Sequence, residues 1–177
     1  MRTTPAGSPR FRRTSKGYAM AEMPAAMWLL FVGFLIPLVI FVSLGYRATI
    51  LYFASDSAAR KAAKAPTFTD ANTRVSSALT TNLANFTGIS AAAPSLSVLA
   101  KPLSGGAPVI TKGKLSAGSV DTSKNLYFVI TTVDADLDPL VAVKPTWMSL
   151  SVPGLTGPYH LQLSLESYSE NPNGLTN

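Results

Sequence analysis

The sequence predicts an α+β fold, in which a long N-terminal transmembrane helix continues into a small extracytoplasmic domain of a helix packed on an antiparallel sheet. Two observations favour this class. Residues 23–46 form an uncharged apolar run, and the distal half contains stretches in which apolar and polar residues alternate as they do in half-buried strands. With 177 residues, the chain has room for one ordinary domain and its appendages.

The apolar run, MPAAMWLLFVGFLIPLVIFVSLGY, contains 24 residues. As a helix it would extend about 36 Å, which exceeds a hydrocarbon core of about 30 Å. We expect Pro24 in the first turn of this helix, and Pro37 should kink it unless a neighbour satisfies the carbonyl that it frees. A buried core helix is the alternative, but core helices rarely run so long without a polar face.

The net charge of +6 is concentrated before Gly17, in a short arm that has no acidic residue. The basicity therefore belongs to this arm, and a nucleic-acid partner is not expected. Because the five basic residues of the arm are unopposed, whereas Asp56 partly offsets Arg47, Arg60, Lys61 and Lys64 after the run, the N-terminus should stay cytoplasmic and the C-terminal domain should cross the membrane. The basic residues of the arm are Arg2, Arg10, Arg12, Arg13 and Lys16.

Two targeting signals are alternatives to a permanent span. A cleavable secretory signal would have an apolar core of only about 7–15 residues, although FASDSAA after the run resembles a cleavage site. The pair Arg12-Arg13 suggests a twin-arginine signal, but TSKG follows where that signal has hydrophobic residues. Both alternatives stay open on the sequence alone.

The helix should continue beyond the apolar run to residue 65, because residues 48–65 are rich in alanine and Pro66 follows. Asp70 is the expected N-cap of a second helix that ends near Phe86, with Gly88 as its stop. An apolar stripe at spacings of four, four and three should face inward on this helix. The stripe consists of Val75, Leu79, Leu83 and Phe86.

The remaining chain reads as short strands. One or two are expected in 95–118, the strongest in 126–133, a possible one in 146–152 and a half-buried one in 160–168. In the last of these, Leu161, Leu163 and Leu165 share one face. The ending NPNGLTN, residues 171–177, should be disordered.

The N-terminal segment resembles a type IV prepilin-type leader: a short basic leader ends in Gly17, and YAMAE then precedes an unbroken apolar helix. The resemblance implies that a prepilin peptidase cuts between Gly17 and Tyr18 on the cytoplasmic side. It also implies that Glu22 pairs with the free amine that Tyr18 carries in a neighbouring subunit. Such pairing would neutralise two charges that lipid disfavours. The alternative is that Glu22 only sits in the headgroup layer.

Further along, SLGYRATILYFASDSAARKAAKA, YFVITTVDADLDPL and YHLQLSLESYSE are similar to segments of the TadE-like proteins of tight-adherence (Flp) pilus assembly. The chain departs from the family pattern where Met23 follows the glutamate and in the positions of its prolines. The resemblance implies four parts. These are a basic leader at 1–17, a transmembrane and extended helix at 18–65, an α+β head at 66–170 and a tail at 171–177.

The function implied is that of a minor pilin or accessory protein in pilus or secretion-system assembly. Its expected partners are prepilin peptidase, other pilin-like subunits with the assembly machinery, and membrane lipid. The expected location is the inner (cytoplasmic) membrane as a single-pass protein. The alternative is a permanently anchored extracytoplasmic binding module whose leader is not cleaved.

Other candidate chemistry is weak. Asp134, Asp136 and Asp138 alternate and could approach a Ca²⁺ ion from one strand face, but Pro139 and Pro145 stand where an EF-hand has glycine and glutamate. We therefore expect no metal there. The chain has no cysteine, and its one histidine has no partner pattern for catalysis. We expect no enzymatic activity and no cofactor.

Overall fold

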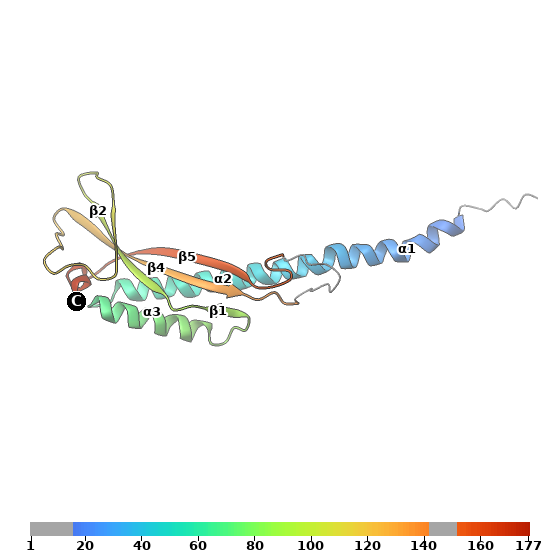
Figure 1. The fold of residues 1–177 in the computed structure, drawn as a ribbon, viewed down its shortest axis with the longest axis horizontal. Coiled ribbons are helices and arrows are strands. Elements are labelled where there is room, and N and C mark those ends of the chain that lie inside the picture. The colour runs from blue at the N-terminus through green and yellow to red at the C-terminus, as the bar shows by residue number, and fades with distance from the viewer. Residues whose placement is uncertain (1–15, 142–151) are drawn as a thin grey trace, which may run out of the picture. The chain divides into compact units, whose positions relative to one another are not determined.

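The structure, a computed structural model, describes residues 16–141 and 152–177 (Figure 1). The chain divides into two compact units, residues 1–38 and 39–177, and each is described by itself. Three helical elements follow one another without a break: α1 (Lys16–Leu30), the π-helix η1 (Phe31–Leu35) and α2 (Ile36–Ala63). The α+β class predicted from the sequence is confirmed, because the long apolar helix packs on a five-stranded antiparallel sheet and one further helix joins it.

The two prolines of the apolar run lie in different helices, Pro24 in α1 and Pro37 in the first turn of α2. Pro24 lies inside α1 and not in its first turn, because the helix begins at Lys16, upstream of the apolar run. The residues between Lys16 and the apolar run include alanine, methionine and glutamate, which are good helix formers. The irregularity expected near Pro37 appears as the π-helix just before it, where the N–H of Ile36 donates to the carbonyl of Phe31.

The second helix, α3 (Phe68–Leu83), begins three residues earlier than predicted. Its N-cap is Thr67, whose Oγ1 accepts a hydrogen bond from the N–H of Asp70 at 3.1 Å. Asp70 therefore lies in the first turn, where its negative charge favours the helix dipole and where it pairs with Arg74 at 2.9 Å. A threonine followed by an acid three residues later satisfies the cap better than Asp70 alone would.

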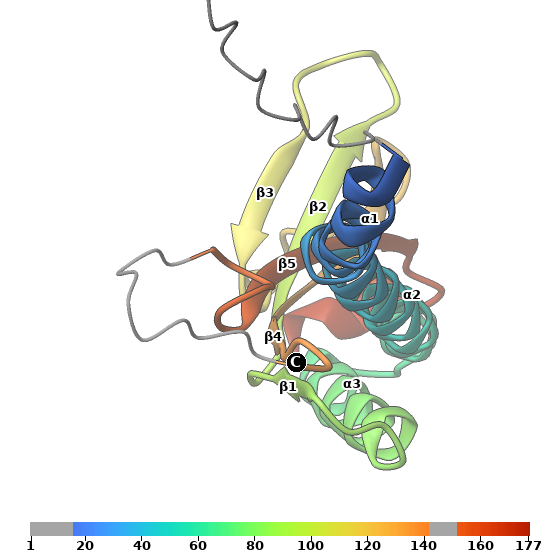
Figure 2. The same ribbon diagram turned by 90° about the vertical axis from the view of Figure 1, so that its right-hand side faces the viewer.

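The sheet is centred on the long strand β4 (Asn125–Leu137). On one side, β4 pairs with β5 (Tyr159–Tyr168) over ten residues. On the other side it pairs first with β2 (Ser95–Pro102) and then with β1 (Ile89–Ala91), which follow one another along the same edge of β4. The strand β3 (Val109–Lys112) forms a hairpin with β2 (Figure 2). All these strand pairs are antiparallel, and among the described strands β1, β3 and β5 each pair with a single neighbour.

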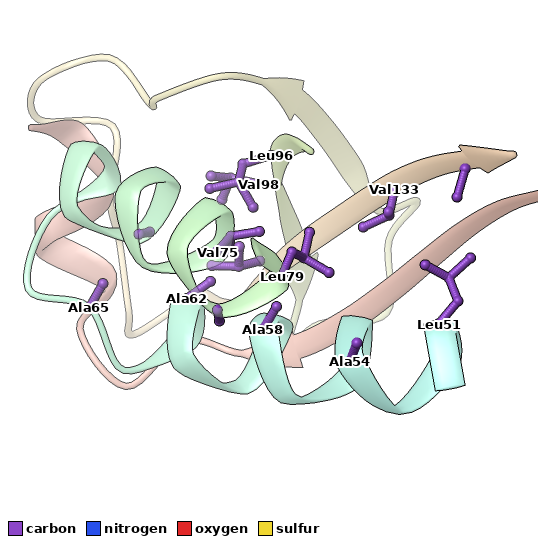
Figure 3. Close-up of a cluster of buried hydrophobic side chains, with 14 of the residues drawn as sticks. Leu51, Ala54, Ala58, Ala62, Ala65, Val75, Leu79, Leu96, Val98 and Val133 are labelled. Atoms are coloured by element: carbon purple, nitrogen blue, oxygen red, sulfur yellow. The ribbon is translucent and has the colours of Figure 1, made fainter. Parts of the chain in front are cut away.

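Alternate residues of β4 face the two helices and form the core of the second unit. On α2 the core-facing positions are mostly alanine, which lets the helix lie close to the sheet. Figure 3 shows the α2 side chains beneath those of α3 and the strands. The predicted inward stripe of α3 is buried at Val75 and Leu79, whereas Phe86 lies beyond the helix and is exposed. The labelled core residues are Leu51, Ala54, Ala58, Ala62, Ala65, Val75, Leu79, Leu96, Val98 and Val133.

The C-terminal segment differs from the disordered tail that the sequence led us to expect. Pro172–Thr176 form a 3-10 helix, and Leu175 is only 3% exposed. The N–H of Phe68, at the start of α3, donates to the backbone oxygen of Asn177 at 2.9 Å. Residues 171–177 have a composition typical of a loop. They are ordered because Leu175 is buried and because N–H groups at the start of α3, which have no partner within the helix, donate to Asn177. The possible strand at 146–152 falls largely outside the described residues.

Candidate functional site

The residues of the predicted cleavage and assembly site lie on α1. Gly17 and Tyr18 are in its first turn, and Glu22 follows one turn after Tyr18. Backbone N–H groups in a first helical turn have no intrahelical partner. Glu22 is exposed, and the next charged residue along the chain is Arg47. The leader residues 1–15 lie outside the described residues.

Beyond Glu22, the helix of the first unit is apolar on all sides. Its large side chains are exposed, and Trp28, at 71%, is among the most exposed. Ala25, Trp28, Leu29 and Val32 line a shallow apolar hollow on this surface together with Gly33. Within the described part of the chain, the helix Glu22–Ala63 is the one that is long and apolar enough to cross a membrane. A surface of this kind needs lipid or other helices to cover it.

The aspartates considered as metal ligands do not come together as a set of three. Asp134 and Asp136 share the outer face of β4, as their spacing predicts, whereas Asp138 follows the end of the strand. Each of the first two has a partner on β5: Gln162 Nε2 donates to Asp134 Oδ1 at 2.7 Å, and His160 Nδ1 lies 3.0 Å from Asp136 Oδ1. Among the residues that the structure describes, no cluster of three or more metal-ligating side chains is found. These pairs are cross-strand contacts on an exposed sheet face.

Arg47 is a site residue that the sequence analysis missed. It lies on α2 directly after the apolar run, and its guanidinium donates to the backbone carbonyl of Asp138 at the end of β4. Gly88, with φ of 78°, leaves room for the same group, because a β-carbon there would lie 2.6 Å from Arg47 Cζ. Asp138 in turn donates its N–H to the carbonyl of Gly88 at 2.9 Å. Arg47 therefore links α2 to the end of the sheet. The sequence feature that could have identified it is its position as the first charged residue after the apolar run.

A long apolar N-terminal helix followed by an antiparallel sheet defines a pilin-like architecture. Comparison of the chain with protein-family models, with curated proteins and with solved structures finds no match. The class therefore rests on the architecture and on the residues described above.

Proposed function

We propose that the protein is a single-pass, pilin-like assembly protein of the TadE type, a minor pilin or accessory subunit of a pilus or secretion system. It is synthesised with a basic leader, cut between Gly17 and Tyr18, and held in the cytoplasmic membrane by its N-terminal helix. Its leader faces the cytoplasm and its α+β head lies on the other side of the membrane.

The observation that carries this proposal is the continuity of the helix Glu22–Ala63, whose two halves have different surroundings. The N-terminal half is apolar and exposed in the first unit, whereas the C-terminal half is the spine on which the sheet and α3 pack in the second. A protein built only to anchor a domain needs an apolar helix and a linker. A helix that continues into the core of the head instead makes the membrane segment and the spine of the head one continuous element, which suits an assembling subunit.

Glu22 supports the assembly role because it is an ionisable residue at the start of an apolar, exposed helix. Charged groups at such positions are costly in lipid and are usually paired. After cleavage, Tyr18 would carry a free N-terminal ammonium. In a neighbouring copy of the subunit, this ammonium would be the cation closest to Glu22. A pair between two chains neutralises both groups and fixes their axial register.

Replacement of Glu22 tests the proposal in the native membrane. We expect Glu22→Ala to be cleaved and inserted but to lose association with other pilin-like subunits, because breaking a buried ion pair costs about 3–5 kcal/mol. Glu22→Gln keeps the size and some hydrogen bonding and should be milder. The measurement is the amount of partner subunit that co-purifies after cross-linking. Glu170→Ala, which removes an exposed acid of the head, is the matched control.

Normal association of both Glu22 variants would contradict an assembly role for this carboxylate and leave it as an interfacial residue. Loss of membrane insertion in Glu22→Ala would also contradict the account, because the apolar helix should insert without it.

A further inference from the structure

One end of the sheet lies beside the last turns of the apolar run. The strand register places Ile89, Leu137 and Tyr159 in one row at this end, which we call the base of the head. The Arg47 contact described above ties the same end to α2. The base therefore sits at the level of α2 where the uncharged run stops and charged residues begin.

The head also covers one side of the run itself, through the connection that leads into β5. Ile40 and Leu44, which belong to the apolar run, are only 1% and 8% exposed. A β-carbon on Gly154 would lie 2.8 Å from Leu44 Cδ1, and Leu155 packs against the same cluster. Val42, on another side of the helix, remains exposed. Part of the head thus takes the place that lipid would otherwise occupy on this helix.

The position of this overlap along the helix places it at a bilayer surface. The run would extend about 36 Å, so about 6 Å of it lies beyond a hydrocarbon core of about 30 Å. Ile40 lies about 9 Å before the end of the run at Tyr46, at about 1.5 Å per residue. Any segment packed on Ile40 and Leu44 is then at the depth of the headgroups and the upper acyl chains.

The outward side of the base is apolar. Four large side chains on three separate chain segments are exposed there, and we call them the basal surface: Phe86, Leu140, Val141 and Tyr159. Titratable residues occur close to it in sequence on three of the segments at this end, with Arg47 on α2, Asp138 after β4 and His160 on β5, whereas the segment that carries Phe86 has none nearby. Exposed apolar side chains next to titratable groups are typical of a surface that enters a membrane interface.

We infer that the basal surface rests in the interface of a lipid bilayer, as a second membrane contact in addition to the transmembrane helix. This inference rests on the membrane insertion included in the proposed function. Aromatic residues such as Phe86 and Tyr159 favour the interface, and the aliphatic pair Leu140 and Val141 can enter the upper acyl region. The head is then held in one orientation by two contacts and does not swing about its helix.

The absence of cysteine makes site-specific labelling of the full chain direct. Three single-cysteine variants carry an environment-sensitive fluorophore: Leu140→Cys on the basal surface, Val42→Cys on the exposed apolar helix, and Leu103→Cys near the other end of β4. Leu140 and Leu103 are both leucines that are 57% exposed, so they form a matched pair. They flank a strand of 13 residues, which extends about 40 Å. Tyr159→Cys is a second reporter of the basal surface.

The labelled full chains are reconstituted in phosphatidylcholine vesicles that contain a lipid-borne nitroxide quencher at a shallow acyl position. We expect the fluorescence at positions 140, 159 and 42 to fall at least about twofold, and that at 103 to be unchanged, because interfacial segments lie about 5–10 Å into the headgroup and acyl boundary. Iodide in the water should quench the label at 103 strongly and the label at 140 weakly.

Quenching by lipid at position 42 without quenching at 140 and 159 would overturn the lipid contact of the basal surface. It would leave the transmembrane helix unaffected. No quenching at 42 would instead overturn membrane insertion and, with it, the proposed function. A label at 140 that is shielded from iodide yet not quenched by lipid would show that protein covers the basal surface, which also overturns the lipid contact.

Discussion

Thr131 lies in the middle of β4 on the face toward the helices and is fully buried. Within the described residues, its hydroxyl has no hydrogen-bond partner. The adjacent Thr132 faces the other side of the sheet, where its hydroxyl lies 3.0 Å from that of Ser164. A buried hydroxyl without a partner costs free energy, whereas a paired and exposed one does not.

We therefore expect Thr131→Val to raise the free energy of unfolding by about 1 kcal/mol, since it removes the unpaired hydroxyl and keeps the shape of the side chain. Thr132→Val is the neighbouring control and should leave stability unchanged or lower it by about 0.5 kcal/mol. Denaturant unfolding of the detergent-solubilised full chain, followed by circular dichroism, measures both. A Thr131→Val chain less stable than the wild type would show that the hydroxyl is satisfied in the folded protein.

In the proposed processing step, Gly17 is the residue before the cut. A peptidase that needs a small residue at the cut should not accept Gly17→Val, because the β-branched side chain prevents close approach of the backbone. We expect this variant to keep its full length on a gel. Gly7→Val changes another glycine of the leader and should be processed normally. Normal shortening of Gly17→Val would mean that the cut lies elsewhere.

At the scale of elements, the sequence predicts what depends on local patterns. The alternation in LQLSL identified β5, and its three leucines are half-buried on one face as predicted. The β-branched and aromatic run identified β4, although the strand extends to Leu137. By contrast, β1 has three residues, ISA, and exists because it pairs with Ala135–Leu137. A strand that depends on a partner distant in sequence leaves no local signal.

In addition to the apolar core, one cation links α2 to the end of the sheet. Arg47 donates to a backbone carbonyl, and a hydrogen bond from a charged donor is worth about 1.5–3 kcal/mol. We expect Arg47→Met, which keeps most of the aliphatic stem, to lower the free energy of unfolding by an amount in this range.

The control for Arg47→Met is Arg60→Met. Arg60 also lies on α2 but pairs with Asp56 across one exposed turn, at 3.0 Å, and such a pair contributes only about 0.3–0.5 kcal/mol. The same unfolding measurement serves both variants. If both variants lower the free energy of unfolding by the same small amount, the Arg47 contact does not fasten the sheet to the helix.

At the scale of the whole molecule, the candidate site separates into a part that the sequence predicts and a part that it does not. Gly17, Tyr18 and Glu22 lie within six residues, so their spacing alone is enough to predict a leader and a paired carboxylate. The basal surface is different, because Phe86, Leu140 and Tyr159 come from separate segments that only the sheet register brings to one end. No window of sequence contains that arrangement, and the burial of Ile40 and Leu44 inside an apolar run is equally invisible without the fold.

We propose that the helix beginning near Tyr18 is the mature N-terminus of a pilin-like subunit and also the spine of its head. The most direct test is the intact mass of the protein purified from its native membranes. We predict a chain that begins at Tyr18, with residues 1–17 removed. A chain that retains residues 1–17 would contradict the claim and would favour a permanently anchored binding module.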